Sequence, residues 1–476
     1  MDLAVDLSAR GDRTTAIYRA LLGAIRAGRL APGDRVPPTR VLARDLGVSR
    51  TTVATAYDRL SAEGFLATRV GAGTYVTDLA TPVTREPRPG ALRPREGWTF
   101  TPAPTSGGQP PPAHDFRVGI PDASLFPFDA WRRLLAAEVR AGAHTPGTYA
   151  APAGHPDLRA AISRCIAVSR GVTADPEDIL VTRGAQQALD VVARVLVEPG
   201  DVVAVEDPGY PQARDVFASH GARVVPVRVD DEGLVVDEVP PEARVVYTTP
   251  SHQFPYGPPL SRRRREVLLE LADRHGIAVV EDDYDSEFRF VEGPLDTLHS
   301  LDAHGRVLYL GTWSKSLLPA LRSGYVVAPE SLREALRAAR QLADGHGEPA
   351  TEAALARFIS DGLLAAHVRR ARAAYAERRA LLHTELDRLL GDRLTVVPSA
   401  AGLHLTATFT DPAVDDRAVV AAAAGEGVAL DALTSYAVGP GSRSGLVLGY
   451  GALRPETVRP GLELLARQVE RSAPSR

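Results

Sequence analysis

The sequence of 476 residues contains one cysteine and one lysine, and it has no long apolar run. The single cysteine, Cys165, excludes an intramolecular disulfide framework and a cysteine-rich zinc site, and we predict no metal site. A run of about 18 apolar residues is absent, so we expect no helix that crosses a membrane. The start, MDLAVDLSARGDR, lacks the basic and then apolar pattern of a secretory signal. We therefore expect a soluble cytoplasmic protein.

Lysine has been replaced by arginine almost everywhere in this chain. Lysine and arginine total 55 and Lys315 is the one lysine, which leaves 54 arginines. Arginine serves as well as lysine in surface ion pairs and phosphate binding. However, only lysine can lose its proton near neutral pH, attack a carbonyl group and form a Schiff base. Lys315 is therefore a candidate nucleophile. The alternative is that Lys315 escaped replacement by arginine by chance and has no special role. The residues around it decide between the two interpretations.

Charge is divided unevenly along the chain. Residues 10–77 carry 11 arginines against five acids, a local charge of +6, whereas the whole chain carries −4. A basic segment joined to an acidic body suggests a polyanion-binding module, and the alternative is an ordinary solvated surface. With 44% hydrophobic residues the chain can bury a sizeable core, which excludes a wholly disordered chain.

A proline-rich segment, residues 80–113, separates the basic module at 10–79 from a body at 114–476. The segment holds nine prolines and four glycines and shows no periodic apolar pattern. This composition predicts a stiffened linker that can reach about 100 Å. Beyond it, β-branched runs such as ILVT, VVAVE and IAVVEDD alternate with helical stretches rich in Ala, Leu and Arg. The alternation predicts an α/β sheet.

The basic module has the pattern of a winged helix-turn-helix. A first helix is expected over residues 14–29, a second opens at Thr39, and a third follows the Gly47-Val48-Ser49 turn with Ser49 as its cap. The string FLATRVGAGTYVTD predicts two short strands that form a wing. The helix faces expected to be buried consist of Ile17, Leu21, Leu22, Ile25, Val53, Ala56, Tyr57 and Leu60.

The string GDRVPPTRVLARDLGVSRTTVATAYDRLSAEGFLATRVGAGTYV closely resembles the GntR-type winged helix over nearly the whole module. The resemblance implies double-stranded DNA as the partner, with an operator of paired half-sites. Pro38 stands where the family more often has serine, so a phosphate-contacting hydroxyl is lost or moved to Thr39. The candidate DNA-binding residues are Arg40, Ser49, Arg50, Thr51, Thr52, Arg69 and Gly71.

In the body, three segments place polar or aromatic residues after predicted strands. In ILVTRGAQQALDVVARVL, the amides of Gly184, Ala185 and Gln186 at a helix start form an anion site. In VEDPGYPQAR, Tyr210 can stack on a flat ligand. The strand in IAVVEDDYDSEF ends in acids, as expected at the ligand-binding edge of a parallel sheet. The alternatives are a packed loop tyrosine and helix-capping or solvated acids.

The fourth segment, RVLYLGTWSKSLLPALRSGYVV, contains the only lysine. Lys315 follows a strand, with Thr312 and Ser314 before it and Arg322 seven residues after it. A pyridoxal 5′-phosphate (PLP) site needs an amine for the aldehyde, donors for the phosphate and a carboxylate for the pyridine nitrogen. This context favours Lys315 as the catalytic residue over a chance survivor.

In this order and spacing, the four segments resemble the fold-type I aminotransferases over residues 114–476. The resemblance implies PLP as cofactor and a homodimer with shared PLP sites. It implies a covalent bond of PLP to Lys315. It further implies that Asp282 pairs with the pyridine nitrogen, that Tyr284 contacts the ring hydroxyl and that Tyr210 stacks on the ring. Arg322 and Thr312 are implied to bind the phosphate, and Tyr149 to contact the phosphate of the neighbouring subunit.

The sequence departs from the aminotransferase pattern around the ring hydroxyl and the phosphate. HQFPYG, residues 252–257, replaces the usual Asn-Pro-Thr-Gly, so the asparagine that normally touches the ring hydroxyl is missing. His252 and Gln253 are the candidates to replace it, the sequence leaves the choice open, and Gln253 is kept among the cofactor-binding candidates. Arg183 and Ala185 stand where hydroxyl residues are common. This predicts a phosphate site with more charge and fewer hydroxyls.

A second departure concerns the substrate. Val447 stands where aminotransferases often carry a carboxylate-binding arginine, and no arginine follows Tyr210 directly. Arg443, four residues before Val447, is the alternative carboxylate-binding arginine, but we expect it to be a surface residue. A weak clamp for a substrate carboxylate argues against efficient transamination.

A GntR-type winged helix, a proline-rich linker and an aminotransferase-like body in one chain resemble the MocR family of transcription regulators. EDPGYP, PSHQFP, EDDYDSEF and GTWSKSLLPALRSGY carry this resemblance. It implies a PLP-binding and DNA-binding regulator, and we expect a PdxR-like role in which PLP itself controls vitamin B6 synthesis. The alternatives are a regulator that responds to a PLP adduct of a GABA- or taurine-type amine, and an active aminotransferase with a DNA-binding appendage. A scaffold that has lost PLP is contradicted by the retained lysine.

Overall fold

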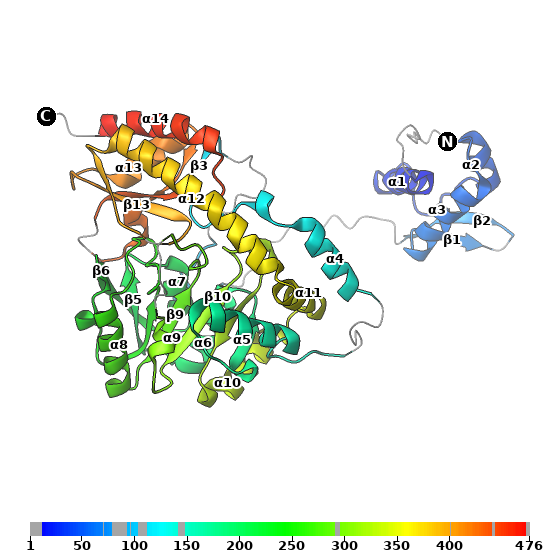
Figure 1. Cartoon of the computed structure of the whole chain (residues 1–476). Helices are drawn as coiled ribbons and strands as arrows, with labels where there is room; N and C mark the ends of the chain where they lie inside the picture. Colours follow the sequence, from blue (N-terminus) through cyan, green and yellow to red (C-terminus); the bar gives the residue numbers. More distant parts are fainter. Residues whose placement is uncertain are drawn as a thin grey trace. The chain divides into compact units, whose positions relative to one another are not determined.

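A computed structural model of the chain describes residues 12–69, 71–78, 93–95, 97–102, 112–140, 148–290, 296–399, 401–439 and 443–472. The chain divides into two compact units, Met1–Gly97 and Trp98–Arg476, which we describe separately (Figure 1). The division falls inside the predicted linker 80–113, most of which lies outside the described residues. Within the described ranges, no helix is both long enough and apolar enough to cross a membrane.

The smaller unit has three helices followed by a two-stranded antiparallel sheet. Its elements are α1 (Arg13–Arg26), α2 (Thr39–Asp45), α3 (Arg50–Ala62), β1 (Leu66–Arg69) and β2 (Gly73–Val76). The apolar faces predicted for α1 and α3 form its core, and Ile17, Val53 and Leu60 are fully buried. Truncation of such a side chain to alanine costs about 2–5 kcal/mol.

Local sequence sets the ends of α2 and α3. Gly47 adopts a positive φ of 63° after α2, a conformation that is costly for residues with a side chain. The Ser49 hydroxyl accepts a hydrogen bond of 3.1 Å from the Thr52 amide and caps α3 as predicted. Helix α1 ends at Arg26, three residues before the predicted end. The turn between α2 and α3 is thus the one that the sequence predicts.

The larger unit is built on an eight-stranded sheet in the order β4-β11-β10-β9-β8-β5-β6-β7. Strands β10, β9, β8, β5 and β6 are parallel, whereas β11 and β7 are antiparallel to their neighbours. The bounds are β4 (Ile179–Thr182), β5 (Val202–Asp207), β6 (Arg223–Asp230), β7 (Gly233–Leu234), β8 (Ala243–Thr248), β9 (Ala278–Asp283), β10 (Val307–Thr312) and β11 (Gly324–Val327).

Helices cover both faces of this sheet, which explains the continuous apolar runs of its strands. Successive residues of β9 illustrate this, because Val279 packs in the cluster of α8 and Val280 in the cluster of α6 and α10. The helices are α4 (Phe128–Glu138), α5 (Pro156–Arg170), α6 (Ala185–Leu196), α7 (Pro211–Ser219), α8 (Arg262–His275), α9 (Leu298–Leu301), α10 (Arg333–Asp344) and α11 (Pro349–Ser360).

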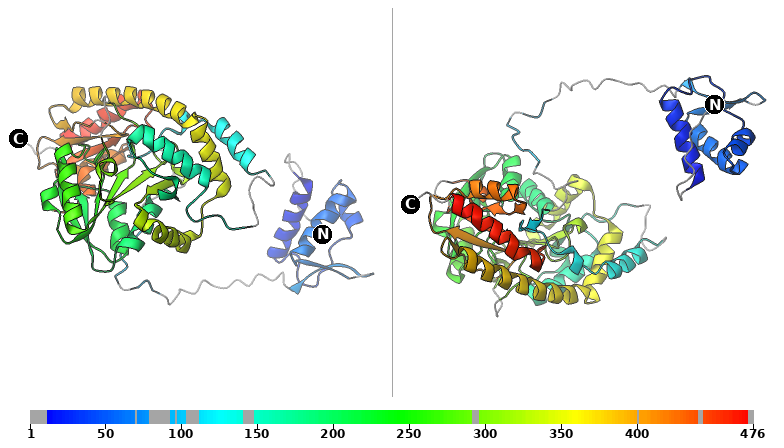
Figure 2. Two further views of the ribbon diagram at one scale, coloured as in Figure 1. Left: turned by 60° about the horizontal axis from the view of Figure 1, so that its bottom comes forward. Right: turned by 90° about the horizontal axis from the view of Figure 1, so that it is seen from above.

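A second layer follows the long helix α12 (Leu363–Leu390). Its antiparallel sheet has the order β12-β13-β16-β15, and α12, α13 and α14 pack on one face of it (Figures 1 and 2). Strand β3 pairs with β14, so the start of the body is tied to this layer. The bounds are β3 (His114–Asp115), β12 (Leu394–Val396), β13 (His404–Phe409), α13 (Asp416–Gly425), β14 (Val428–Ala429), β15 (Asp431–Ala432), β16 (Gly445–Gly449) and α14 (Pro455–Ser472).

Candidate functional site

The carboxyl ends of β5, β8, β9 and β10 surround a cavity of about 330 Å³ in the larger unit. In a parallel sheet these ends lie at one edge, which is where ligands bind. Gly119 and the second layer, through His404 and Tyr436, complete the wall. The cavity therefore combines side chains from distant parts of the sequence.

Lys315 lies in the turn after β10, as predicted, and lines this cavity. Its Nζ donates a hydrogen bond of 2.9 Å to the carbonyl oxygen of Gly119. Burial lowers the pKa of the Lys315 amine, while the nearby carboxylates of Asp285 and Asp282 oppose that shift. A lowered pKa increases the fraction of neutral amine, which is the nucleophilic form.

Asp282 is the one of three consecutive acids that faces the cavity. Tyr247 donates a hydrogen bond of 2.7 Å to Asp282 Oδ2, whereas Asp282 Oδ1 is buried without a partner among the described residues. Burial raises the pKa of this carboxyl to about 7. A buried acceptor without a donor is costly, so the site fits a ligand that brings an N–H group.

The two flanking acids, Glu281 and Asp283, point to the other face of β9, because side chains alternate along a strand. Glu281 accepts hydrogen bonds from the amides of Leu298 and His299 and caps α9. Asp283 accepts a hydrogen bond of 2.9 Å from Arg170 Nε and pairs with that guanidinium. Helix capping, the alternative weighed from sequence, is thus correct for Glu281.

The start of α6 is a candidate anion site. Gly184, at a φ of +84°, is the N-cap of this helix, and Ala185 and Gln186 line the cavity. The free amides at a helix start carry partial positive charge and bind anions. A Cβ atom built on Gly184 would lie 3.5 Å from Arg322 Nη1 and 3.9 Å from Ser314 Oγ. The Arg322 guanidinium and the Ser314 hydroxyl thus lie beside the helix end, and the positive φ of Gly184 is what favours glycine there.

Thr312 and Arg322 complete this anion site. The Thr312 hydroxyl donates a hydrogen bond of 3.0 Å to Ser314 Oγ and accepts one from the Ser314 amide. Arg322 is the one described residue other than glycine with a positive φ, 47°. Such a conformation costs of order 1 kcal/mol and clusters at functional sites. A guanidinium, hydroxyls and helix amides together suit a phosphate.

Arg183 does not add charge to this anion site. Its Nε atom forms an ion pair of 3.1 Å with Asp344, and its side chain does not line the cavity. The idea that Arg183 supplies extra phosphate charge is therefore corrected. Long-range pairing with an acid on α10 decides its position.

Tyr210 directly precedes α7 and lines the cavity beside Phe254, with ring centroids 5.7 Å apart. Burial raises the pKa of Tyr210 to about 12, so the phenol stays neutral. Its placement at the end of β5 is the one predicted for a ring that stacks on a flat ligand.

Gln253 is not brought to the cavity, which corrects its prediction as a cofactor-binding residue. Its Nε2 donates to Glu206 Oε2 at 3.0 Å and to the Pro208 carbonyl at 2.9 Å, and its Oε1 accepts from the Tyr256 amide. The buried carboxylate of Glu206 needs these donors, and this need turns the Gln253 amide away. The side chain of this segment that lines the cavity is Phe254, which has no polar atom.

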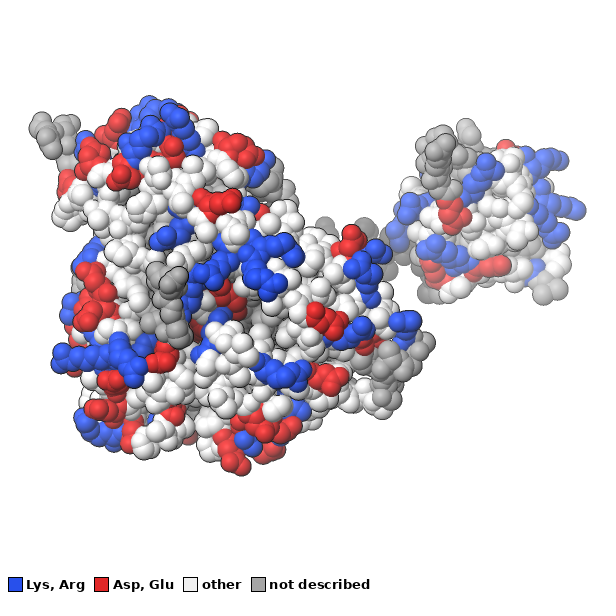
Figure 3. All heavy atoms as spheres, viewed as in Figure 1, with Lys and Arg blue, Asp and Glu red and all other residues white. Residues whose placement is uncertain are grey.

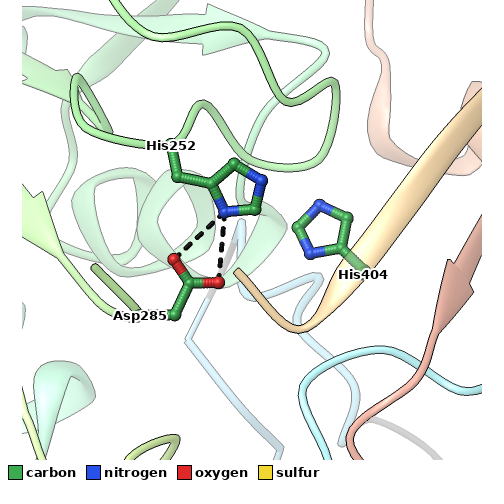
Figure 4. Close-up of side chains that lie close together, drawn as sticks. All are labelled: His252, Asp285 and His404. Carbon is green, nitrogen blue, oxygen red and sulfur yellow. Dashed lines mark hydrogen bonds and ion pairs between the residues drawn. The ribbon is translucent and has the colours of Figure 1, made fainter. Parts of the chain in front are cut away.

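Tyr284 lines the cavity as predicted, and His252 stands behind it. The Tyr284 hydroxyl lies 3.0 Å from His252 Nδ1. His252, Asp285 and His404 form a buried group whose ligand-type atoms lie within 4.8 Å of one another (Figure 4). His252 does not line the cavity itself, but it contacts three residues that do, namely Tyr284, Asp285 and His404.

Three other residues weighed from sequence lie outside the cavity. Tyr149 is 93% exposed and does not line the cavity of its own chain. Val447 is buried beneath Tyr256 and Leu433. Arg443 contacts the hydroxyl of Tyr256 and is largely exposed. Among the described residues, neither Val447 nor Arg443 lines the cavity, so neither is placed to bind a substrate carboxylate there.

On the smaller unit, the candidate DNA-binding residues are accessible. Arg40, Arg50, Thr51, Arg69 and Gly71 are exposed, as are all ten arginines between residues 12 and 78. Figure 3 shows arginine side chains on the visible face of this unit. The exposed start of α3 and the wing thus present a basic surface to a polyanion.

The hydroxyls at the start of α3 have a second role. Ser49 Oγ lies 2.8 Å from Thr52 Oγ1, and both groups belong to the helix cap. On the wing, the Arg69 guanidinium lies 5.0 Å from the centre of the Tyr75 ring. These contacts fix side chains that the sequence assigns to the DNA interface.

Comparison with known proteins agrees with both units. Residues 13–76 match the gntR family of bacterial regulatory proteins, and residues 118–447 match the aminotransferase class I and II family. Over 462 residues the chain is 39% identical to the probable rhizopine catabolism regulatory protein MocR of Rhizobium meliloti, covering 94% of this chain and 92% of that protein. The chain belongs to the MocR family.

This MocR-family chain is a helix-turn-helix transcriptional regulator with an aminotransferase-like domain, and both the predicted family and the predicted fold class are confirmed. It is 34% identical over 435 residues to the pyridoxine biosynthesis regulator PdxR of Corynebacterium glutamicum, covering 91% of each chain. Its body resembles the kynurenine aminotransferase of Pyrococcus horikoshii, with a TM-score of 0.70 and 27% identity over 76% of this chain and 91% of that chain.

Sequence reasoning missed Tyr247, Phe254 and His404 in the cavity of this MocR-family regulator. Tyr247 stands near the end of β8, and that strand-end position was the available signal. Its bond to Asp282 depends on β8 lying beside β9, where Tyr247 is paired with Val280. His404 comes from a different sheet, so no local pattern indicates it.

Proposed function

We propose that this MocR-family regulator binds PLP covalently at Lys315 and that PLP binding changes how its winged helix binds operator DNA. One observation carries the proposal: an amine, an unpartnered buried carboxylate oxygen and an anion site meet in one cavity of about 330 Å³. PLP has a group for each of them, namely an aldehyde, a pyridine nitrogen and a phosphate. When bound, PLP supplies an electron-withdrawing ring.

In this proposal each side chain acts on one part of the cofactor. Asp282 Oδ1 accepts a hydrogen bond from the protonated ring nitrogen, and Tyr210 stacks on the ring. Arg322, Thr312 and the amides of Gly184, Ala185 and Gln186 bind the phosphate. Tyr284 donates to the ring hydroxyl. The free acceptor on Asp282 and the close approach of Arg322 to the α6 start support these roles.

We further propose a homodimer with shared PLP sites. Tyr149 is the residue that supports it, because it is 93% exposed and lies outside its own cavity, as expected of a side chain that serves a neighbouring subunit. A dimer also presents two winged helices to an operator with paired half-sites. We expect this regulator to act in the cytoplasm, where operator DNA and PLP are both present.

PLP alone is the effector that we favour, in a role like that of the pyridoxine biosynthesis regulator PdxR. Among the described residues that line the cavity, the cationic side chains are Lys315 and Arg322, and both have roles toward PLP. Burial lowers the pKa of His404 well below its ordinary value, so this ring is neutral. An amino-acid carboxylate would thus lack a guanidinium of its own.

Fluorescence anisotropy of the labelled promoter tests the proposal. We expect PLP alone to change the Kd for DNA, and Lys315→Ala to remove that change while its Kd without PLP stays at the wild-type value. A ligand must bind the two states of the regulator differently to shift DNA binding. A response only to PLP with GABA or taurine would overturn PLP as the sole effector. Steady turnover of an amino donor with 2-oxoglutarate would instead favour an enzyme.

A further inference from the structure

The Nδ1 atom of His252 is surrounded by three oxygen atoms. Asp285 Oδ1 and Oδ2 lie 3.0 and 3.1 Å away, and the Tyr284 hydroxyl lies 3.0 Å away. His252 and Asp285 are 2% and 1% exposed, so no bulk water competes for these contacts. Figure 4 shows the imidazole with Nδ1 turned toward the carboxylate.

These contacts decide where two protons lie. A ring nitrogen offers either one proton or one lone pair, and a carboxylate only accepts. The bond to Asp285 therefore requires a proton on His252 Nδ1. Because that nitrogen is then a donor, the Tyr284 hydroxyl cannot donate to it. Burial also raises the pKa of Tyr284 well above its ordinary value, so the phenol keeps its proton.

We infer that His252 and Asp285 form a positioning pair that directs the Tyr284 phenol proton into the cavity. This inference rests on the proposed function, because the acceptor in the cavity is the ring oxygen of PLP. The pair holds the phenol oxygen from behind and leaves the cavity as the direction for its hydrogen. Neither His252 nor Asp285 has to touch the ring hydroxyl.

A cation held by His252, Asp285 and His404 fits these contacts less well. His252 Nδ1 and the two Asp285 oxygens already bond to each other at 3.0 and 3.1 Å, so this nitrogen has no free lone pair for a cation. Gly402 packs against the group, since a Cβ there would lie 2.0 Å from His252 Cε1 and 2.8 Å from Asp285 Oδ2. The backbone at Gly402 thus packs closely against both the imidazole and the carboxylate.

The titratable side chains nearest to His252 are Asp285, Tyr284 and His404. A donor to the ring oxygen of PLP favours the deprotonated form of that chromophore, so loss of the donor raises the pH at its spectral midpoint. We expect a rise of about one pH unit in Tyr284→Phe and also in His252→Phe. Asp285→Asn is not used to decide, because the Asp285 carboxylate also raises the pKa of the Lys315 amine and its loss acts on the chromophore directly.

The test is a pH titration of the visible absorbance of the PLP-loaded full chain, with thermal unfolding as the folding control. The decisive variant is Tyr284→Phe combined with His252→Phe. If His252 acts through Tyr284, the double variant shows the same midpoint as Tyr284→Phe alone. Additive shifts, or a wild-type midpoint in His252→Phe, would overturn the positioning pair and leave PLP binding intact. A wild-type chain without a PLP chromophore would contradict the proposed function itself.

Discussion

The amine of Lys315 is hydrogen-bonded to the carbonyl oxygen of Gly119, which precedes it by 196 residues. Gly119 adopts a φ of +77°, and a Cβ at this position would lie 2.6 Å from Lys315 Nζ. The absence of a side chain at 119 therefore leaves room for the amine at this carbonyl group. A backbone segment near the start of the larger unit thus contacts and orients a side chain that follows β10.

Gly119→Ala should displace the amine and weaken PLP binding by about 10- to 100-fold. Gly276→Ala is the matched control, because Gly276 has a similar φ of +72° and nothing within 4 Å of an added Cβ. Each variant should lose about 1 kcal/mol of stability from its backbone conformation. Absorbance titration with PLP measures the difference. Equal PLP affinities in the two variants would refute the role of Gly119.

Asp282→Asn should stabilise the PLP-free protein at high pH while weakening PLP binding. Burial raises the pKa of Asp282 from 3.8 to about 7. The protonated carboxyl therefore contributes its full stability to the fold below pH 3.8, and this contribution is lost as the pH rises through about 7. Asparagine never ionises and avoids that loss. Thermal unfolding between about pH 4 and about pH 8 should show a variant whose advantage grows with pH. An advantage that is independent of pH would contradict this account.

Arg322→Ala should distinguish PLP from pyridoxal, which lacks the phosphate. Removal of a charge-assisted hydrogen bond should lower the affinity for PLP by about 10- to 100-fold and leave the affinity for pyridoxal nearly unchanged. Alanine is as unfavourable as arginine at a φ of +47°, so backbone strain is matched. Equal losses for the two ligands would place Arg322 away from the phosphate.

Arg50→Ala should weaken operator binding by about 1–3 kcal/mol and reduce its salt dependence. Arg59→Ala removes the same charge from the other end of α3, where Arg59 pairs with Glu63. Anisotropy at several salt concentrations compares them. If both variants lose the same operator affinity, the start of α3 does not contact the operator specifically, and each loss reflects only the removal of one positive charge.

Local patterns predicted much of the fold. The buried faces of α1 and α3, the Ser49 cap and the strands of the main sheet follow from periodicity and turn residues. The meeting of Lys315 with Asp282 follows from a topological rule. Asp282 lies near the carboxyl end of β9 and Lys315 follows β10, and these neighbouring parallel strands end at the same edge of the sheet.

The remaining features depend on partners that no local pattern specifies. The Gln253 amide donates a hydrogen bond to the buried carboxylate of Glu206, and Arg183 forms an ion pair with Asp344 on α10. Each choice is set by the cost of leaving a buried or half-buried charge without a partner. His404 enters the cavity only because the second layer packs over the sheet edge.

Borohydride reduction of the PLP-loaded protein, followed by peptide mapping, tests the central claim most directly. Because the chain has one lysine, the account predicts a stable pyridoxyl label on the peptide that contains Lys315 and no label in Lys315→Arg. A label confined to the amino terminus, or no label at all, would contradict it.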